Sequence, residues 1–179
     1  MWTTVILNKV MKPDAYPLPN ISHILNKLGG NSYYSTIDLH DAFWSIPIDE
    51  NDIEKTAFIA HNGLWKFISM PFGLTNAPAT QQRFIESILT GLTWQTCMAY
   101  VDDIVIFLKT FEEHLLHINQ VLTRLQEYKV MIAPEKCSFC LLSFKILGHT
   151  CIAEGTVPNS SKIDLILNYP KPHTKDELT

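Results

Sequence analysis

Tyr100-Val101-Asp102-Asp103 lies between two short apolar runs, residues 97–99 and 104–108. Runs of this length are typical of buried strands, so these four residues are expected to form the turn between two strands. Two adjacent carboxylates repel each other, and burial disfavours the charge of both. A divalent cation removes that cost, and hard oxygen ligands of this kind suit Mg²⁺. The alternative is an exposed acidic turn, and a third carboxylate would distinguish the two.

Asp38 is the candidate for that third carboxylate. It follows residues 33–37, a run rich in aromatic and β-branched side chains that predicts a strand. If this strand lies next to the pair formed by residues 97–108, Asp38 converges with Asp102 and Asp103. Three carboxylates at strand ends can hold two metal ions about 3.5–4 Å apart for in-line phosphoryl transfer.

Several further motifs occur in a fixed order along the chain. They are Tyr16-Pro17-Leu18-Pro19, Leu28-Gly29-Gly30, Ser35-Thr36-Ile37-Asp38-Leu39, Lys55-Thr56-Ala57-Phe58, residues 70–80 (MPFGLTNAPAT), Tyr100-Val101-Asp102-Asp103, Lys136-Cys137 and Leu147-Gly148-His149. Together they resemble the reverse transcriptase domain of gypsy-type LTR retrotransposons and of retroviruses. The resemblance runs from about Leu7 to the end of the chain.

The resemblance implies an α+β fold, with an antiparallel sheet that carries helices on one face. It corresponds to the palm and part of the fingers of a right-handed polymerase. Residues 1–170 are expected to form the reverse transcriptase domain, partial fingers plus palm. Residues 171–179 are expected to be a linker or the start of the following region.

The resemblance also implies roles for individual residues. Asp38, Asp102 and Asp103 are the expected catalytic and metal-binding residues. The expected nucleotide-binding residues are Leu39, Phe43, Phe72, Gly73 and Lys136, and the expected nucleic-acid-binding residues are Gln82, Arg83, Tyr100, Leu147 and Gly148. In the family an aromatic ring at Phe43 lies under the sugar and excludes a 2′-hydroxyl, and a lysine at Lys136 lies near the phosphates. From the sequence alone, Phe43 also fits a core position and Lys136 a solvated one.

The implied activity is RNA-directed DNA polymerisation with two Mg²⁺ ions, or Mn²⁺ in their place. The implied partners are an RNA or DNA template with its primer, a deoxynucleoside triphosphate, and the rest of a pol polyprotein: thumb, connection, ribonuclease H and integrase. The expected location is intracellular, cytoplasmic or particle-associated, without secretion or a membrane partner. The alternative is an inactive, truncated retrotransposon relic that acts at most as a nucleic-acid-binding or assembly module.

The charge balance argues against strong binding of nucleic acid by this chain alone, and two residues depart from the family. The chain of 179 residues is 46% hydrophobic and 18% charged, which is typical of a globular protein. Its net charge is −4 and its only arginines are Arg83 and Arg124, whereas nucleic-acid binders usually carry a basic face. By register, Val5 stands where the family has an arginine for the triphosphate. Gln81 stands where the family usually has an aromatic residue.

The cysteines and the ends of the chain show no sign of secretion. No apolar run reaches the 18 or so residues of a membrane helix, and residues 1–12 lack the apolar core of a signal peptide. Reduced thiols are therefore expected at Cys97, Cys137, Cys140 and Cys151. Cys137 and Cys140, with His149 and Cys151, have the residue types of a zinc site. We expect no metal there, because the family commonly has a cysteine at position 137 without one.

Local signals predict most of the remaining elements. Asn20 is expected to cap a helix that ends at Gly29-Gly30, and Asn76 to begin a helix reaching about Thr90. Thr110 to Glu113 has the pattern of a capping box before another helix. Asn62-Gly63 predicts a type I′ hairpin turn. Residues 44–48 are expected to form a half-buried strand, and residues 159–168 a last helix.

Overall fold

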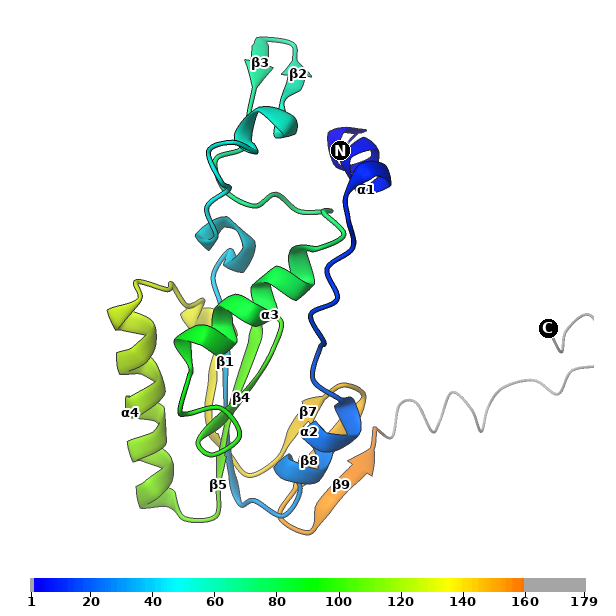
Figure 1. Ribbon diagram of the computed structural model, residues 1–179. Coiled ribbons are helices and arrows are strands. Elements are labelled where there is room, and N and C mark those ends of the chain that lie inside the picture. Colours follow the sequence, from blue (N-terminus) through cyan, green and yellow to red (C-terminus); the bar gives the residue numbers. More distant parts are fainter. Residues whose placement is uncertain (1, 160–179) are drawn as a thin grey trace, which may run out of the picture.

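The computed structural model describes residues 2–159. The expected linker and nearly all of the expected helix over residues 159–168 lie outside this range. Figure 1 shows a lower body that holds most of the elements and a narrower upper part. The upper part carries α1 (Trp2–Val10) and, at its tip, the hairpin of β2 (Phe58–Ala60) and β3 (Gly63–Trp65).

A four-stranded antiparallel sheet forms the centre of the lower body. Its strands lie in the order β4-β5-β1-β6, with the bounds Cys97–Tyr100, Asp103–Leu108, Tyr33–Asp38 and Ser138–Leu141. β5 pairs along its whole length with β1, from Asp103 opposite Asp38 to Leu108 opposite Tyr33. The sheet confirms the predicted antiparallel α+β architecture and the predicted strands around both acidic motifs.

Alternation along the strands gives this sheet two buried faces. One face packs against α3 (Ala77–Ile88) and α4 (Phe111–Glu127), and its core contains Ile37, Leu39, Ile85, Ile88, Cys97, Ala99, Ile104, Ile106, Val121 and Leu125. The other face packs against α2 (Ile21–Leu28) and a second sheet, through Ile24, Leu28, Tyr34, Met98, Val105, Phe107, Phe144 and Cys151. The sequence predicted the helices on the first face; the cover of the second face is additional.

The second sheet has three strands in the order β7-β8-β9, with the bounds Phe144–Ile146, His149–Ile152 and Gly155–Pro158. Leu147 and Gly148 form the turn between β7 and β8, with φ values of 49° and 79°. The 3-10 helix η3 (Pro134–Lys136) connects the α4 side of the molecule to β6.

Two predicted helix starts differ in how they are capped. The Asn20 side chain caps α2 as expected, accepting hydrogen bonds from the backbone N–H groups of Ser22 and His23. At α4, the Thr110 hydroxyl donates instead to the Glu113 carboxylate at 2.6 Å and makes no bond to the helix backbone. The predicted capping box is therefore wrong, because its two side chains pair with each other.

The upper part corrects two further predictions. Ala60 lies opposite Gly63, so His61 and Asn62 form the hairpin turn, and the predicted Asn62-Gly63 turn is wrong. The φ of Gly63 is 139°, far from the left-handed value that a type I′ turn needs. The strand predicted over residues 44–48 is also wrong: residues 42–45 form the 3-10 helix η1 (Ala42–Ser45), and Pro47 makes only an isolated bridge to Ser69. A second 3-10 helix, η2 (Ile53–Thr56), precedes β2.

None of the helices within residues 2–159 is long and apolar enough to cross a membrane.

Candidate active site

The register of the central sheet brings the three acidic residues together. Asp38 ends β1 and lies directly opposite Asp103, the first residue of β5. Residues directly opposite in an antiparallel pair have Cβ atoms about 4.5–5.5 Å apart. Asp102 lies in the two-residue turn between β4 and β5, and its carbonyl oxygen accepts a hydrogen bond from Leu39 N–H at 3.3 Å. The turn is thus tied to the end of β1, where Asp38 lies.

The environment of Asp102 and Asp103 disfavours their negative charge. Burial raises the pKa of Asp102, and the charges of Asp103 and Asp38 raise it further. Burial and the charge of Asp38 also raise the pKa of Asp103. The Oδ1 atom of Asp102 is buried and has no hydrogen-bond partner. An unpaired buried carboxylate oxygen between like charges is the chemistry that a hard divalent cation relieves, so these residues fit Mg²⁺.

The three carboxylates lie at the same end of the sheet but do not form a complete metal-binding site. Within residues 2–159, no three His, Cys, Asp or Glu side chains are gathered closely enough to hold a metal ion as they stand. The three cysteines of the possible zinc site are included in this result: all three have free thiols, Cys151 is buried, and Cys137 and Cys140 are partly buried.

Lys136 supplies a positive charge at this site. Its Nζ lies 3.3 Å from Asp38 Oδ1. The segment before it is docked along the end of β1, since Ala133 N–H donates to the Asp38 carbonyl at 2.9 Å and His40 N–H to the Met131 carbonyl at 2.9 Å. Backbone pairing on both sides of Leu39 therefore holds the segment that carries Lys136 beside the end of β1.

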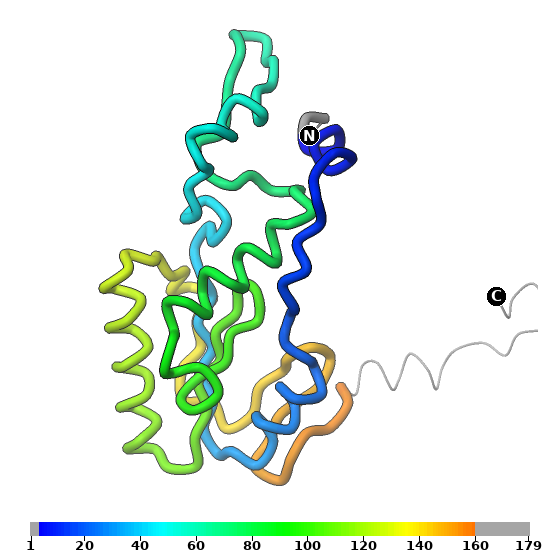
Figure 2. Tube along the Cα trace, in the orientation of Figure 1, coloured from blue at the N-terminus to red at the C-terminus, as the bar shows by residue number. Residues whose placement is uncertain are grey.

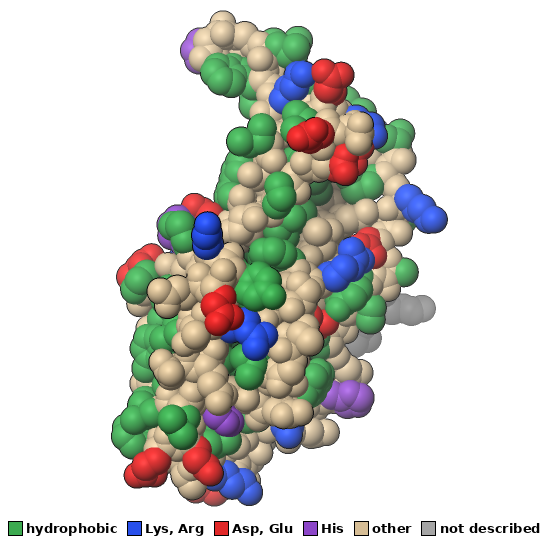
Figure 3. All heavy atoms as spheres, turned by 60° about the vertical axis from the view of Figure 1, so that its left-hand side comes forward, with side chains coloured by type: hydrophobic (Ala, Val, Ile, Leu, Met, Phe, Trp, Pro, Cys, Tyr) green, Lys and Arg blue, Asp and Glu red, His purple; other side chains and the backbone are tan. Residues whose placement is uncertain are grey.

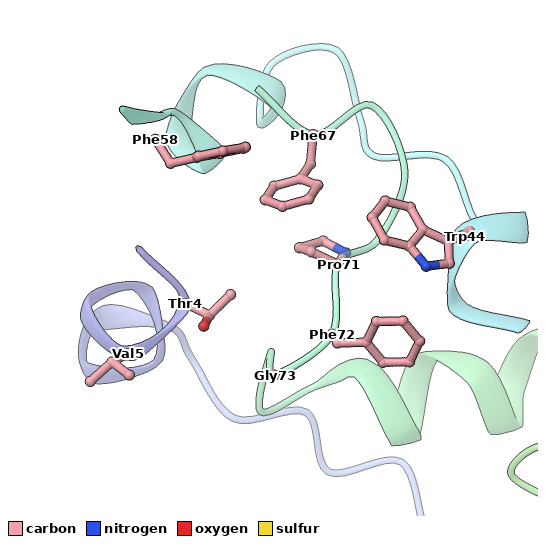
Figure 4. A pocket seen from close by; sticks show the side chains of 8 residues that line it. All are labelled: Thr4, Val5, Trp44, Phe58, Phe67, Pro71, Phe72 and Gly73. Carbon is pink, nitrogen blue, oxygen red and sulfur yellow. The ribbon is translucent and has the colours of Figure 1, made fainter. Parts of the chain in front are cut away.

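The aromatic rings of Phe43 and Phe72 contact each other. The Phe43 ring is half-buried in η1 and contacts the Phe72 ring edge-on, with centroids 5.3 Å apart. Phe72 also lines a cavity of about 560 Å³, whose other lining residues are Thr4, Val5, Trp44, Phe58, Phe67, Pro71 and Gly73. Figure 4 shows the aromatic rings of this cavity gathered around Pro71, with the helix that carries Thr4 and Val5 on the other side.

Leu39 and Gly73, two of the expected nucleotide-binding residues, are notable for their backbone and not for a side chain. The Leu39 side chain is 4% exposed and lies in the core beneath the sheet, so only its backbone faces the acidic turn. Gly73 has a φ of 89°, and a Cβ there would lie 3.3 Å from Thr4 Oγ1. The backbone conformation of the loop at Gly73 therefore favours glycine.

The expected nucleic-acid-binding residues fall into two places. Tyr100, at the end of β4, and Leu147, in the β7–β8 turn beside Gly148, both pack against the core that contains Tyr34. Gln82 and Arg83 lie on α3 at another place. Gln82 is 0% exposed and bonds within the protein, whereas Arg83 is at the surface and bonds to Asp14.

Both arginines already have partners within the protein. The Arg83 guanidinium pairs with Asp14 Oδ2 at 2.5 Å and lies 4.7 Å from the Tyr16 ring centre. Arg124 donates to the carbonyl groups of Ile88 and Thr90 at 2.9 and 3.1 Å, where α3 ends. On the face drawn in Figure 3, basic side chains are scattered among acidic ones and form no continuous patch.

Gln81 and its neighbour Gln82 differ in the hydrogen bonding of their side-chain amides. Gln81 and Gln82 are both 0% exposed on α3, but neither amide atom of Gln81 has a hydrogen-bond partner. A buried unpaired polar group costs about 1–3 kcal/mol. We expect Gln81→Met, which keeps the length of the side chain, to raise the free energy of unfolding by about 1 kcal/mol, or the Tm by roughly 2–4 °C.

Gln82→Met is the matched control for this change, because it removes an amide whose atoms are bonded. It is expected to lower the Tm. Thermal unfolding by circular dichroism measures both variants, and a lower Tm for Gln81→Met would show that the Gln81 amide has a partner.

Sequence reasoning missed Glu86, which bonds to both Gln82 and Tyr16. Its position four residues after Gln82 on a helix is the one signal that could have found it, since residues i and i+4 are neighbours on a helix surface.

Comparisons with known proteins identify the family of this chain. Residues 3–151 match the family model described as reverse transcriptase (RNA-dependent DNA polymerase). The chain is 43% identical over 171 residues to the retrovirus-related Pol polyprotein from transposon 297 of Drosophila melanogaster, covering 96% of this chain and 16% of that polyprotein. It is 34% identical over 172 residues to the transposon Tf2-3 polyprotein of Schizosaccharomyces pombe, covering 96% of this chain and 13% of that polyprotein. The chain thus spans a small part of the curated relatives it matches.

Solved structures show the same fold. The foamy viral protease-reverse transcriptase in complex with double-stranded DNA superposes with a TM-score of 0.86 at 27% identity, covering 98% of this chain and 31% of that chain. The foamy viral enzyme in complex with an RNA/DNA hybrid gives a TM-score of 0.80 at 28% identity, covering 96% and 23% of the two chains. These matches confirm the predicted palm and partial fingers. The chain therefore belongs to the reverse transcriptase (RNA-dependent DNA polymerase) family.

Proposed function

We propose that this chain carries the polymerase site of an RNA-directed DNA polymerase. In the proposed reaction, the 3′-hydroxyl of a primer attacks the α-phosphate of a deoxynucleoside triphosphate, and pyrophosphate leaves. The observation that carries the proposal is the cross-strand pairing of Asp38 with Asp103, next to Asp102 in the turn. In a chain of this family, that pairing places three carboxylates at one end of the central sheet.

Asp38, Asp102 and Asp103 would hold the Mg²⁺ ions, with Mn²⁺ as an alternative. When bound, such ions lower the pKa of the attacking hydroxyl and offset the charge of the phosphates. The unpaired Asp102 Oδ1 offers an oxygen that no protein donor competes for. Lys136, 3.3 Å from Asp38 Oδ1, partly offsets the acidic charge and would contact a phosphate group.

The other proposed roles follow from position. Phe43 would lie beneath the sugar of the incoming nucleotide, supported from the side by Phe72. Tyr100 and the turn at Leu147 and Gly148 would together contact the primer, and their packing against one core supports a shared location. Gln82 and Arg83 would act on nucleic acid indirectly, through the elements they hold.

Charge argues that the proposed activity also depends on the rest of a polyprotein. With a net charge of −4 and both arginines paired within the protein, this chain offers few contacts to nucleic-acid phosphates. Each missing phosphate contact lowers the affinity for nucleic acid and makes that affinity depend less on salt. We therefore propose as partners a primer–template, a deoxynucleoside triphosphate and flanking polyprotein regions, in the cytoplasm or in a particle.

Primer extension tests the function. The chain is produced alone and with the flanking fingers and thumb of a related polyprotein, and each form is given an RNA template, a DNA primer and Mg²⁺. We expect template-directed extension by the longer form and little by the 179-residue chain. Absence of extension by the longer form, with its fold intact by circular dichroism, would reject the function. Strong extension by the short chain would show that the flanking regions are dispensable.

A further inference from the structure

Val101, in the acidic turn, has an unfavourable backbone conformation. Tyr100 pairs with Asp103, so Val101 and Asp102 alone make the turn between β4 and β5. The φ of Val101 is 54°, in the left-handed region. A β-branched residue rarely adopts this conformation, which costs on the order of 1–3 kcal/mol. Something around the turn must therefore hold Val101 in place.

The Gln82 side chain supplies that support from α3. Its Oε1 accepts a hydrogen bond from Val101 N–H at 2.8 Å, and its Nε2 donates to the Ala99 carbonyl at 3.0 Å. Gln82 is 0% exposed, so water does not compete for these bonds. The amide thus spans the end of β4 and the turn that follows it.

This support requires one orientation of the amide. If the amide were reversed, its NH₂ group would face Val101 N–H and two donors would meet. Glu86, one helical turn further along α3, lies with Oε1 2.6 Å from Gln82 Nε2. A carboxylate can only accept, so Glu86 requires the NH₂ group on its side and leaves the Gln82 oxygen facing Val101. A hydrogen bond to a charged acceptor is also stronger than a neutral one.

Glu86 is itself fixed from its other side. The Tyr16 hydroxyl donates to Glu86 Oε2, so both carboxylate oxygens are engaged. Tyr16 belongs to the extended segment between α1 and α2, which runs alongside α3 (Figure 2). Arg83 fastens this segment through Asp14 and the face of the Tyr16 ring. A continuous chain of hydrogen bonds therefore runs from Tyr16 through Glu86 and Gln82 to Val101.

We propose that Glu86 is a positioning residue for the acidic turn: it orients the Gln82 amide, and the amide holds Val101. Asp102 and Asp103 follow Val101 directly, so a relaxed turn displaces both carboxylates. The kinetic part of this proposal rests on the proposed polymerase function, whereas the hydrogen-bond chain itself does not.

Hydrogen exchange tests the hydrogen-bond chain without metal or substrate. In the ¹⁵N-labelled 179-residue chain, Glu86→Ala is expected to speed exchange of the Val101 amide about tenfold, the value of one hydrogen bond, with the central amides of β5 unchanged. Glu86→Gln still presents an oxygen to Gln82 and is expected to retain the protection. Tyr16→Phe is expected to give a smaller increase than Glu86→Ala.

A double-mutant cycle shows whether Glu86 acts through Gln82. In the Gln82→Met chain the Val101 amide is already unprotected, so adding Glu86→Ala should change its exchange no further. Additive effects would overturn the proposal, and so would Val101 exchange that Glu86→Ala leaves within about twofold of the original.

Kinetics of the longer chain, with the flanking fingers and thumb, test whether Glu86 affects catalysis. Glu86→Ala is expected to lower kcat by about tenfold to a hundredfold with KM for the triphosphate unchanged, since a displacement of about 1 Å can cost a hundredfold. Ile88→Val, a buried change on the same helix, controls for lost stability and should leave kcat unchanged. An equal loss in Ile88→Val, or an unchanged kcat in Glu86→Ala, would contradict the positioning role. If the unchanged longer chain fails to extend a primer, the polymerase function is rejected, and the exchange experiment still decides the hydrogen-bond chain.

Discussion

Asp102→Asn is expected to lower nucleotide incorporation by the longer chain on the order of a thousandfold. Metal ions contribute several kcal/mol to stabilising charge in such reactions, and each 1.4 kcal/mol corresponds to about a tenfold change in rate. Asparagine keeps the size of Asp102 but removes its charge and adds an NH₂ donor that cannot bind a cation. Single-turnover incorporation on an RNA template measures the loss, and the affinity for primer–template should stay the same.

The same variant has an opposite effect on stability. The pKa of Asp102 is raised, so its ionised form costs stability at neutral pH in the absence of metal, and the cost falls as the pH is lowered toward the raised pKa. Asp102→Asn removes that cost, and its Tm without metal should match or exceed that of the original. Mg²⁺ should raise the Tm of the original, because an ion that binds only the native state stabilises it, and should not raise that of the variant.

Asp52→Asn is the matched control, because Asp52 is exposed in the upper part and pairs only with Lys55. It should leave incorporation and the Mg²⁺ effect unchanged. Incorporation by Asp102→Asn within about tenfold of the original would mean that Asp102 holds no catalytic ion.

The sequence predicted the acidic site because its signals are local. A strand that ends at Asp38 and a hairpin around Asp102 and Asp103 are visible in short windows, and the pairing of Asp38 with Asp103 needed only that these strands be neighbours. The exact register was not predictable, because it depends on the packing of Ile37 and Ile104 into one core.

Contacts over long sequence separations could not be predicted. Gln82 was expected to face nucleic acid, yet its amide bonds to Val101, 19 residues away. Tyr16 bonds to Glu86, 70 residues away in the sequence, and no periodicity or motif predicts that contact. The second buried face is a similar case, since α2 and the sheet containing Phe144 each carry only a few of the apolar side chains that cover it.

Phe43→Ala is expected to weaken the discrimination between deoxyribonucleotides and ribonucleotides about 10–200-fold. A steric contact of this size is worth roughly 1–3 kcal/mol in a binding site. The Phe43 ring is half-buried, follows Asp41, whose φ of 47° turns the backbone after β1, and contacts the Phe72 ring edge-on at 5.3 Å. If the sugar lies over this ring as proposed, a ring held in this way cannot move aside for a 2′-hydroxyl, whereas alanine leaves room for it. The ratio of kcat/KM for each deoxynucleotide and its ribonucleotide measures the effect.

Trp44→Ala separates this role from a loss of packing. Trp44 is the next residue in η1, contacts Phe67 and Phe72, and lines the cavity together with them. Removing its ring weakens the same aromatic cluster but opens no space under the sugar, so the Tm should fall while discrimination stays. If Phe43 were only a core residue, Phe43→Ala would behave as Trp44→Ala does, with a lower Tm and an unchanged ratio. A changed ratio in Phe43→Ala alone therefore assigns the ring to the nucleotide, and equal ratios in the two variants assign it to the core.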